Sequence, residues 1–147
     1  MPFSIEGWVE VSRRGSPAEQ AWESLIRIGS LIDVADEVSE RLFGLSKRSV
    51  SAEAAVAAVA AGRGVPPNHS TAVRGALAEL ADHERQFGTG EVGGYTFMTW
   101  AEVKAAEIEP AVIEKSQWSL LFDLICRLEE DTRFSDDLIR FVVWYNW

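Results

Sequence analysis

The two ends of this chain alternate apolar and polar side chains with the period of two that a half-buried β-strand requires. In residues 3–11 the apolar face is formed by Phe3, Ile5, Val9 and Val11. In residues 137–147 the inward set is Ile139, Phe141, Val143 and Tyr145. Each terminal strand alone would be an unpaired edge with an apolar face to bury, so we expect the two to be neighbours in one small sheet.

Capping residues and a helical apolar period predict helices between the two ends. The segment 16–19, SPAE, predicts the start of a helix that ends at Gly29. Ser30 predicts the start of a second helix, which Gly44 ends. Further helices are predicted over residues 70–87, from the capping box that begins at Thr99 as far as Pro110, and over residues 117–130. The middle of the chain is therefore mainly helical, with one more short strand over 95–98.

Together these elements predict an α+β fold in which a small antiparallel or mixed sheet, including both terminal strands, packs with about five helices. The chain has 147 residues, a length that suits one hydrophobic core, so we expect a single globular domain over 1–147. Residues 46–70 are rich in Ala, Gly and Pro. Such residues bury little area, so we expect this segment to be weakly docked or mobile within the domain.

The chain carries a net charge of -9, which favours partners with a basic surface. An acidic domain repels phosphate backbones, so no nucleic acid is expected as a partner. No apolar run has the length of a membrane span, and we expect no membrane association. The first residues, MPFSIEGWVEV, contain glutamates where a signal peptide needs a basic and then an apolar segment. We therefore expect a cytoplasmic protein.

Several motifs of known chemistry occur in the sequence without the context that the chemistry needs. Gly88, Gly90 and Gly93 spell G-x-G-x-x-G, but a helix is predicted before them and a strand after them, the reverse of a dinucleotide site. Two nearby apolar leucines and an isoleucine predict that Cys126 is a small buried hydrophobe. We expect no cofactor and no metal, and we assign no catalytic residue.

Two sets of residues are candidates for binding. The first is Asp33, Asp36, Glu37 and Glu40, which cluster opposite the apolar stripe of the second predicted helix. They form either an ordinary solvated face or an acidic docking surface. The second set, on the other faces of the terminal strands, is Trp8, Arg140 and Trp144. Either helices cover both faces of the sheet and bury these tryptophans, or an exposed aromatic patch remains as an interaction hot spot.

Five short segments carry a resemblance to other proteins. They are EGWVEV at 6–11, LFGL at 42–45, RGVPP at 63–67, YTFMTWAEVKAAEI at 95–108 and IRFVVWYNW at 139–147. In these segments the chain resembles a loose group of small bacterial and phage proteins of unknown function. The resemblance implies a small cytoplasmic accessory protein, with a phage derivation among the origins it allows. It carries no activity onto any residue.

Three functional hypotheses follow from the sequence. The first is an accessory protein that binds another protein with a basic surface, such as a host or toxin-like target. It is favoured by the negative charge, by the many tryptophans and by the missing catalytic signatures. The second is an enzyme with a noncanonical carboxylate-based site, which buried carboxylates in a deep pocket would favour. The third is a structural or self-assembling component. The oligomeric state and the order of the strands are not specified by the sequence.

Overall fold

The computed structural model describes residues 4–12, 21–45, 58–88 and 92–146, and its centre is a four-stranded antiparallel sheet. The strands are β1 (Ser4–Val11), β2 (Glu23–Arg27), β3 (Val92–Thr99) and β4 (Ile139–Asn146). Their order in the sheet is β2-β1-β4-β3. The prediction of an α+β fold with the first and last strands paired is confirmed.

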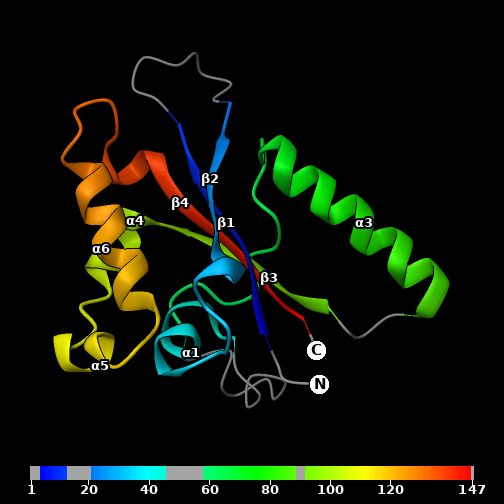
Figure 1. The fold of residues 1–147 in the computed structure, drawn as a ribbon, viewed down its shortest axis with the longest axis horizontal. Coiled ribbons are helices and arrows are strands. Elements are labelled where there is room, and N and C mark those ends of the chain that lie inside the picture. The colour runs from blue at the N-terminus through cyan, green and yellow to red at the C-terminus, as the bar shows by residue number, and fades with distance from the viewer. Residues whose placement is uncertain (1–3, 13–20, 46–57, 89–91, 147) are drawn as a thin grey trace.

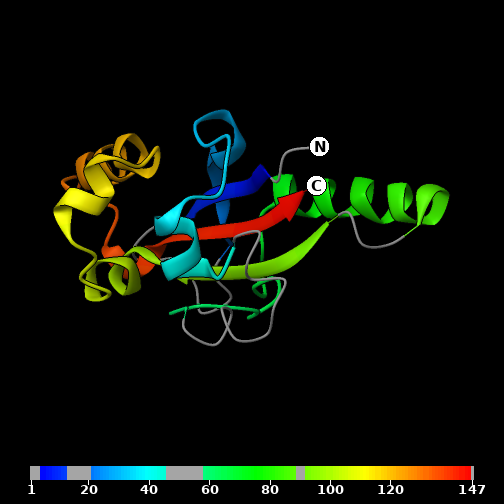
Figure 2. The ribbon, with the colours of Figure 1, turned by 90° about the horizontal axis from the view of Figure 1, so that it is seen from below.

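Helices cover both faces of this sheet, which Figures 1 and 2 show from two directions. The α-helices are α1 (Glu37–Phe43), α3 (Thr71–Phe87), α4 (Trp100–Ala105), α5 (Pro110–Glu114) and α6 (Trp118–Glu129). Short 3-10 turns span Ile28–Ser30 and Asp136–Leu138. In Figure 1, α1, α4, α5 and α6 lie on one side of the sheet and α3 lies on the other.

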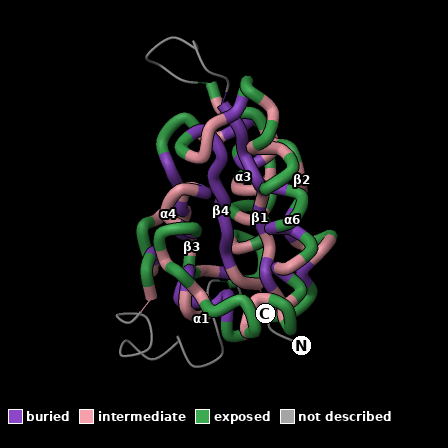
Figure 3. The backbone as a smooth tube through the Cα atoms, turned by 90° about the vertical axis from the view of Figure 1, so that its left-hand side faces the viewer, coloured by how far each residue is buried: buried purple, intermediate pink, exposed green. Residues whose placement is uncertain are grey.

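β4 is the centre of the fold, and in Figure 3 it is buried along nearly its whole length. It pairs with β1 on one side and β3 on the other, with Val9 opposite Phe141. The two terminal strands approach so closely that Gly7 of β1 can only be glycine. Its φ is 143°, and a Cβ there would lie 1.9 Å from the carbonyl oxygen of Val142.

The larger core lies between the sheet and the four helices α1, α4, α5 and α6. The predicted inward set of β4 reaches this core, with Phe141 at its centre. The Phe141 ring lies 6.1 Å from the Trp118 ring and 6.0 Å from the Phe122 ring, both in edge-on geometry. Such aromatic pairs add about 0.5–1.5 kcal/mol beyond the area that they bury. The faces assigned to the terminal strands are therefore correct over the described residues, and Phe3 of the predicted inward set lies outside them.

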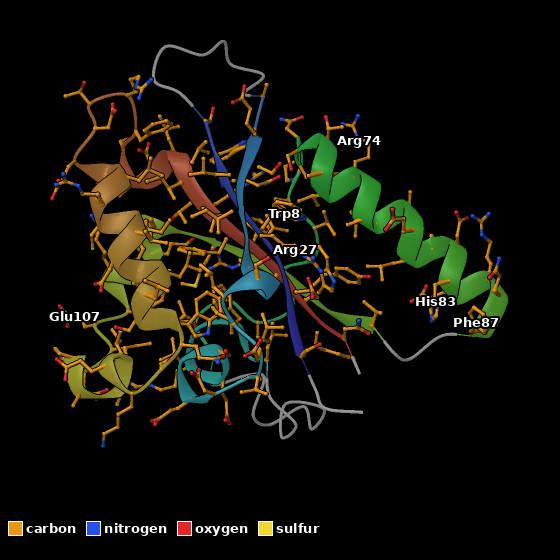
Figure 4. All side chains as sticks on the ribbon, in the orientation of Figure 1. Trp8, Arg27, Arg74, His83, Phe87 and Glu107 are labelled. Atoms are coloured by element: carbon orange, nitrogen blue, oxygen red, sulfur yellow. The ribbon has the colours of Figure 1, made fainter. Side chains whose placement is uncertain are left out.

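The smaller core lies between the sheet and α3, and it contains the buried residues Val73, Val92, Val142 and Trp144. Val73 is the one buried residue of this helix, and its Ala76, Leu77 and Leu80 pack, partly buried, against the same core. Phe87, at its far end, is 70% exposed. Figure 4 shows Phe87 and His83 on the part of the helix that extends away from the sheet. α3 is thus anchored at its N-terminal end.

Two further predictions about local structure are confirmed. Ser70 caps α3 by accepting a hydrogen bond from the backbone N–H of Val73, and this helix ends at Phe87, as predicted. Thr99 and Glu102 form the predicted capping box of α4. Of the predicted weakly docked segment 46–70, residues 46–57 lie outside the described residues.

The predicted helix that ends at Gly29 is wrong where the structure describes it, because residues 23–27 form the edge strand β2. This strand adds to the predicted three strands and gives the sheet its fourth. Its Ile26 lies opposite Val9 of β1 and packs against the larger core. Pairing with β1 outweighs the local preference for helix. Residue propensities do not predict this, because the pairing is a contact between distant parts of the chain.

Three further expectations are also wrong. Ser30 does not begin the second helix; Asp36 does, by accepting a hydrogen bond from the N–H of Ser39. The helix after Thr99 ends at Ala105, and Pro110 begins α5 instead of closing the previous helix. Cys126 is exposed because it lies on the outer face of α6. The left-handed Gly44 does end α1 as predicted, with a φ of 70°.

Candidate functional site

The predicted binding residues lie on opposite sides of the sheet. Trp8 and Trp144 lie on the side of α3, where they belong to the smaller core. Glu37 and Glu40 belong to α1, which packs on the other side through Val38. The two predicted sets therefore do not form one site.

The tryptophans on the α3 side are used inside the fold. Trp144 is 4% exposed, and its ring lies 5.8 Å from the ring of Tyr95. Burial also raises the pKa of the Tyr95 hydroxyl. Trp8 is half-buried in the same cluster. The sequence leaves two alternatives open, burial of the tryptophans under helices or an exposed aromatic patch. Trp144 is buried, so little of its surface is free to contact a partner.

Arg140, the third predicted residue on this side, is part of a buried ion pair. Its Nε donates a hydrogen bond to Oε1 of Glu10 over 2.7 Å, and both side chains are almost completely buried. The Trp22 ring covers its guanidinium at 3.9 Å. Burial lowers the pKa of Arg140, and the charge of Glu10 opposes this effect. The second oxygen of Glu10 accepts the N–H of Ser70 over 2.6 Å, so the pair holds the start of α3 against the sheet.

Sequence reasoning missed the partners Glu10 and Trp22, although one signal for Glu10 was present. Glu10 and Arg140 both lie on the polar faces of the two terminal strands, and the register places them directly opposite each other. Opposite charges in such a cross-strand position stabilise each other. The sequence pattern predicts Trp22 on a helix, and nothing in that pattern indicates a contact with Arg140.

The acidic residues on the other side have two different roles. Asp33 and Gln117 exchange hydrogen bonds, of which the shorter runs from the backbone N–H of Asp33 over 2.8 Å. Asp36 caps α1 and also accepts a hydrogen bond from the hydroxyl of Ser116. These two carboxylates therefore position the chain. Glu37 is largely exposed, and Glu40 is half-buried.

A small pocket of about 210 Å³ opens between the start of α1 and α5. It is lined by Asp36, Glu37, Val38, Ala111, Val112, Lys115 and Ser116. Sites for drug-sized molecules occupy roughly 300–1,000 Å³. This pocket is therefore large enough for one side chain of a binding partner and small for a whole organic substrate. Two of the predicted acidic residues, Asp36 and Glu37, line it.

Two sequence ranges that include α1, α4, α5 and α6 carry together a net charge equal to that of the whole chain. Residues 31–43 contain four acidic and one basic side chain, and residues 100–138 contain ten acidic and four basic side chains. These two ranges, which we call the acidic layer, contribute -3 and -6, equal to the total of -9. The rest of the chain, including α3, has a net charge of zero. Charge is thus concentrated on one side of the sheet.

Ion pairs organise part of this charge. Nη1 of Arg41 lies 2.6 Å from Oε2 of Glu109 and 3.8 Å from a carboxylate oxygen of Glu37, which links α1 to the start of α5. The hydrogen bond from Arg41 lowers the pKa of Glu109. Near α6, Lys104 lies between the carboxylates of Glu129 and Asp136. These bridges fix the helices relative to each other while leaving an excess of carboxylates at the surface.

Residues with metal or redox chemistry are not grouped in the described part of the chain. Within residues 4–12, 21–45, 58–88 and 92–146, no three His, Cys, Asp or Glu side chains are arranged to hold a metal ion. Burial raises the pKa of the Cys126 thiol, which leaves it less of the reactive thiolate. None of the helices in these ranges has the length and apolar character to cross a bilayer.

Comparisons with other proteins add nothing to this description: the chain matches no protein-family model, no curated protein and no solved structure.

Proposed function

We propose that this chain is a small cytoplasmic accessory protein that acts by binding another protein, and that its acidic layer receives a basic surface of that partner. The observation that carries the proposal is the concentration of the whole net charge of -9 in residues 31–43 and 100–138. A surface of one sign attracts a partner of the opposite sign before contact, which raises the association rate.

Exposed apolar side chains on the same layer support contact as well as attraction. Leu120 and Leu124, which are 56% and 43% exposed, are four residues apart on α6 and so share one face of the helix. Val34, before α1, is also exposed. Apolar side chains among charges supply the area that a bound complex buries once steering has brought the partners together.

The acidic layer is also well supported from beneath. Trp118 and Leu121 of α6 are completely buried under it, and the indole N–H of Trp118 donates a hydrogen bond to the hydroxyl of Ser39 in α1 over 2.8 Å. A rigid surface loses little conformational entropy on binding, so more of the contact energy remains as affinity.

The test compares two triple variants of equal net charge as baits in native host cells. One reverses charges on the acidic layer, Glu37→Lys with Glu114→Lys and Asp123→Lys. The matched control reverses charges elsewhere, Glu23→Lys with Glu79→Lys and Asp82→Lys. All six residues are exposed, so both variants should fold. Proteins bound by the wild-type bait are identified by mass spectrometry.

We expect a protein with a basic surface that binds the wild-type and control baits and is lost from the acidic-layer variant. Its association rate should fall as salt rises through 0.15 M, where the Debye length is about 8 Å. If both triple variants retain the same proteins equally, the acidic layer is not the binding surface. If the association rate does not depend on salt, charge does not guide binding.

A further inference from the structure

The pocket between α1 and α5 gives the acidic layer a concave feature of definite size with apolar residues in its lining. Ala111 and Val112 supply its apolar wall, and Val38 behind them belongs to the larger core. Its volume of about 210 Å³ is far above the roughly 10–15 Å³ that one ordered water molecule needs, so water can enter it. Water against an apolar wall is released favourably when a hydrocarbon group replaces it.

The rim of the pocket has carboxylates on one wall and an ammonium group on the other. Both carboxylate oxygens of Asp36 are engaged, one by the Ser39 N–H and the other by the Ser116 hydroxyl. The side chain of Glu37 is 65% exposed, and its contact with Arg41 is a long one of 3.8 Å. Glu37 is therefore the rim carboxylate with capacity for another cation.

Lys115 lines the pocket from the α5 side and restricts where a cation can be placed. A lysine or arginine of a partner would be repelled there and attracted on the α1 side, next to Glu37. The pocket thus has an apolar centre, an acidic edge at Glu37 and a basic edge at Lys115, so a bound segment can place its cation at one edge only.

We propose that this pocket receives one leucine-like aliphatic side chain from a basic segment of the partner, with an adjacent arginine or lysine paired to Glu37. This inference rests on the proposed function and identifies the anchor within it. The charge of the acidic layer favours a basic segment as occupant, and the pocket volume limits the anchor to one side chain.

The test uses two synthetic peptides that differ in one residue. Both are eleven residues long with glycine and arginine throughout; one has a central leucine between arginines and the other has alanine at that position. Binding is measured by fluorescence anisotropy at low salt. We expect the leucine peptide to bind the wild-type chain about tenfold more tightly, since the additional methyl and methylene groups enter an apolar pocket.

Two tryptophan substitutions test the location. Ala111→Trp fills the pocket from an exposed position of α5, and Ala78→Trp is the matched control on an exposed position of α3. We expect the first to remove the preference for leucine and the second to preserve it, with unchanged circular dichroism for both. Lys115→Glu should tighten binding of the leucine peptide about threefold, because it removes repulsion at the basic edge.

The outcomes separate this inference from the proposed function. Equal binding of both peptides, or a leucine preference that survives Ala111→Trp, overturns the anchor pocket but leaves the acidic layer as a binding surface. Weaker binding after Lys115→Glu overturns the assignment of the rim. If neither peptide binds the wild-type chain at low salt, both the pocket and the proposed function are contradicted.

Discussion

The two faces of the sheet differ in how they are held together. Among the described residues, the face covered by α1, α4, α5 and α6 has a cluster of 21 buried apolar residues, whereas the α3 face has a cluster of four. The α3 face also contains the buried ion pair of Glu10 and Arg140, which ties the start of α3 to the sheet. The first face is stabilised mainly by apolar burial, and the second depends on a polar tether.

The same two faces also differ in net charge, and the more highly charged face covers the larger core. The acidic layer is outside the larger core, so the surface with net charge is also the surface with the firmer support. α3 lies outside the smaller core and carries a net charge of only -1. On the proposed function, the partner would contact the side with the firmer support, a form of preorganisation.

Loss of β4 should have the largest effect, because this strand is shared by both faces. Deleting residues 139–147 removes three side chains of the larger core and two of the smaller one, as well as the pairing partner of β1 and β3. Each large buried side chain contributes about 1.5–3 kcal/mol, so the loss is comparable with the whole stability of a domain. We expect the truncated chain to show no cooperative urea transition. A normal transition would mean that neither face depends on this strand.

Breaking the ion pair should destabilise the α3 face more than its small core implies. Arg140→Met leaves Glu10 buried without its cation, and such a loss is worth about 3–5 kcal/mol. Replacing both residues, with Glu10→Leu added, should cost less than the sum of the two single changes, because no charge is left unpaired. Urea denaturation of the four proteins measures the coupling. Strictly additive effects would show that the pair does not hold this face.

One substitution made on each face compares the two cores directly. Leu121→Ala removes a completely buried side chain beneath the acidic layer and should cost about 2–5 kcal/mol. Leu80→Ala removes a half-buried side chain of α3 and should cost about 1 kcal/mol. Both changes can be followed by the denaturant midpoint. Equal losses would mean that α3 is packed as firmly as α6, against the comparison drawn above.

The smallest expected change in stability concerns the ion pair between Arg63, in the segment that precedes α3, and Glu102 of α4. Nη2 of Arg63 lies 2.7 Å from Oε2 of Glu102, and the hydrogen bond from Arg63 is the main cause that lowers the pKa of Glu102. A lowered pKa stabilises the folded chain above the unfolded value of about 4.3, and this contribution disappears as the pH falls through the folded value. Because both side chains are partly exposed and screened, it should not exceed about 1 kcal/mol.

Glu102→Gln should therefore reduce stability slightly at pH 7, and the loss should be smaller at pH 2.5, because the contribution of the ion pair falls as the carboxyl becomes protonated. Denaturant midpoints at the two pH values measure this difference. A loss of the same size at pH 2.5 would show that the charge of Glu102 is not the cause.

The sequence was sufficient to predict those elements whose signals are local. The alternation in the terminal strands is strong because each has one face in the larger core, and the capping box at Thr99 and Glu102 is a contact within one helical turn. β2 could not be predicted in this way. Residues 23–27 have a mixed pattern, and what makes them a strand is β1, whose Val9 lies opposite Ile26.

The candidate site was predictable in its chemistry and not in its shape. The acidic character of the segment around Glu37 is visible in the sequence, as is the net charge. The pocket depends on Ala111, Val112 and Lys115, which are more than seventy residues further along the chain and reach α1 only through the fold. The hydrogen bond between Ser116 and Asp36 that closes one side of it is of the same long-range kind.

The central claim is that the acidic layer, and not α3, receives the partner. The most direct test is hydrogen–deuterium exchange, measured by mass spectrometry on the chain alone and in complex with the protein that the wild-type bait captures. We expect slower exchange on binding in residues 33–43 and 110–130, and no change in residues 71–87. Protection confined to residues 71–87, with none on the acidic layer, would contradict the account.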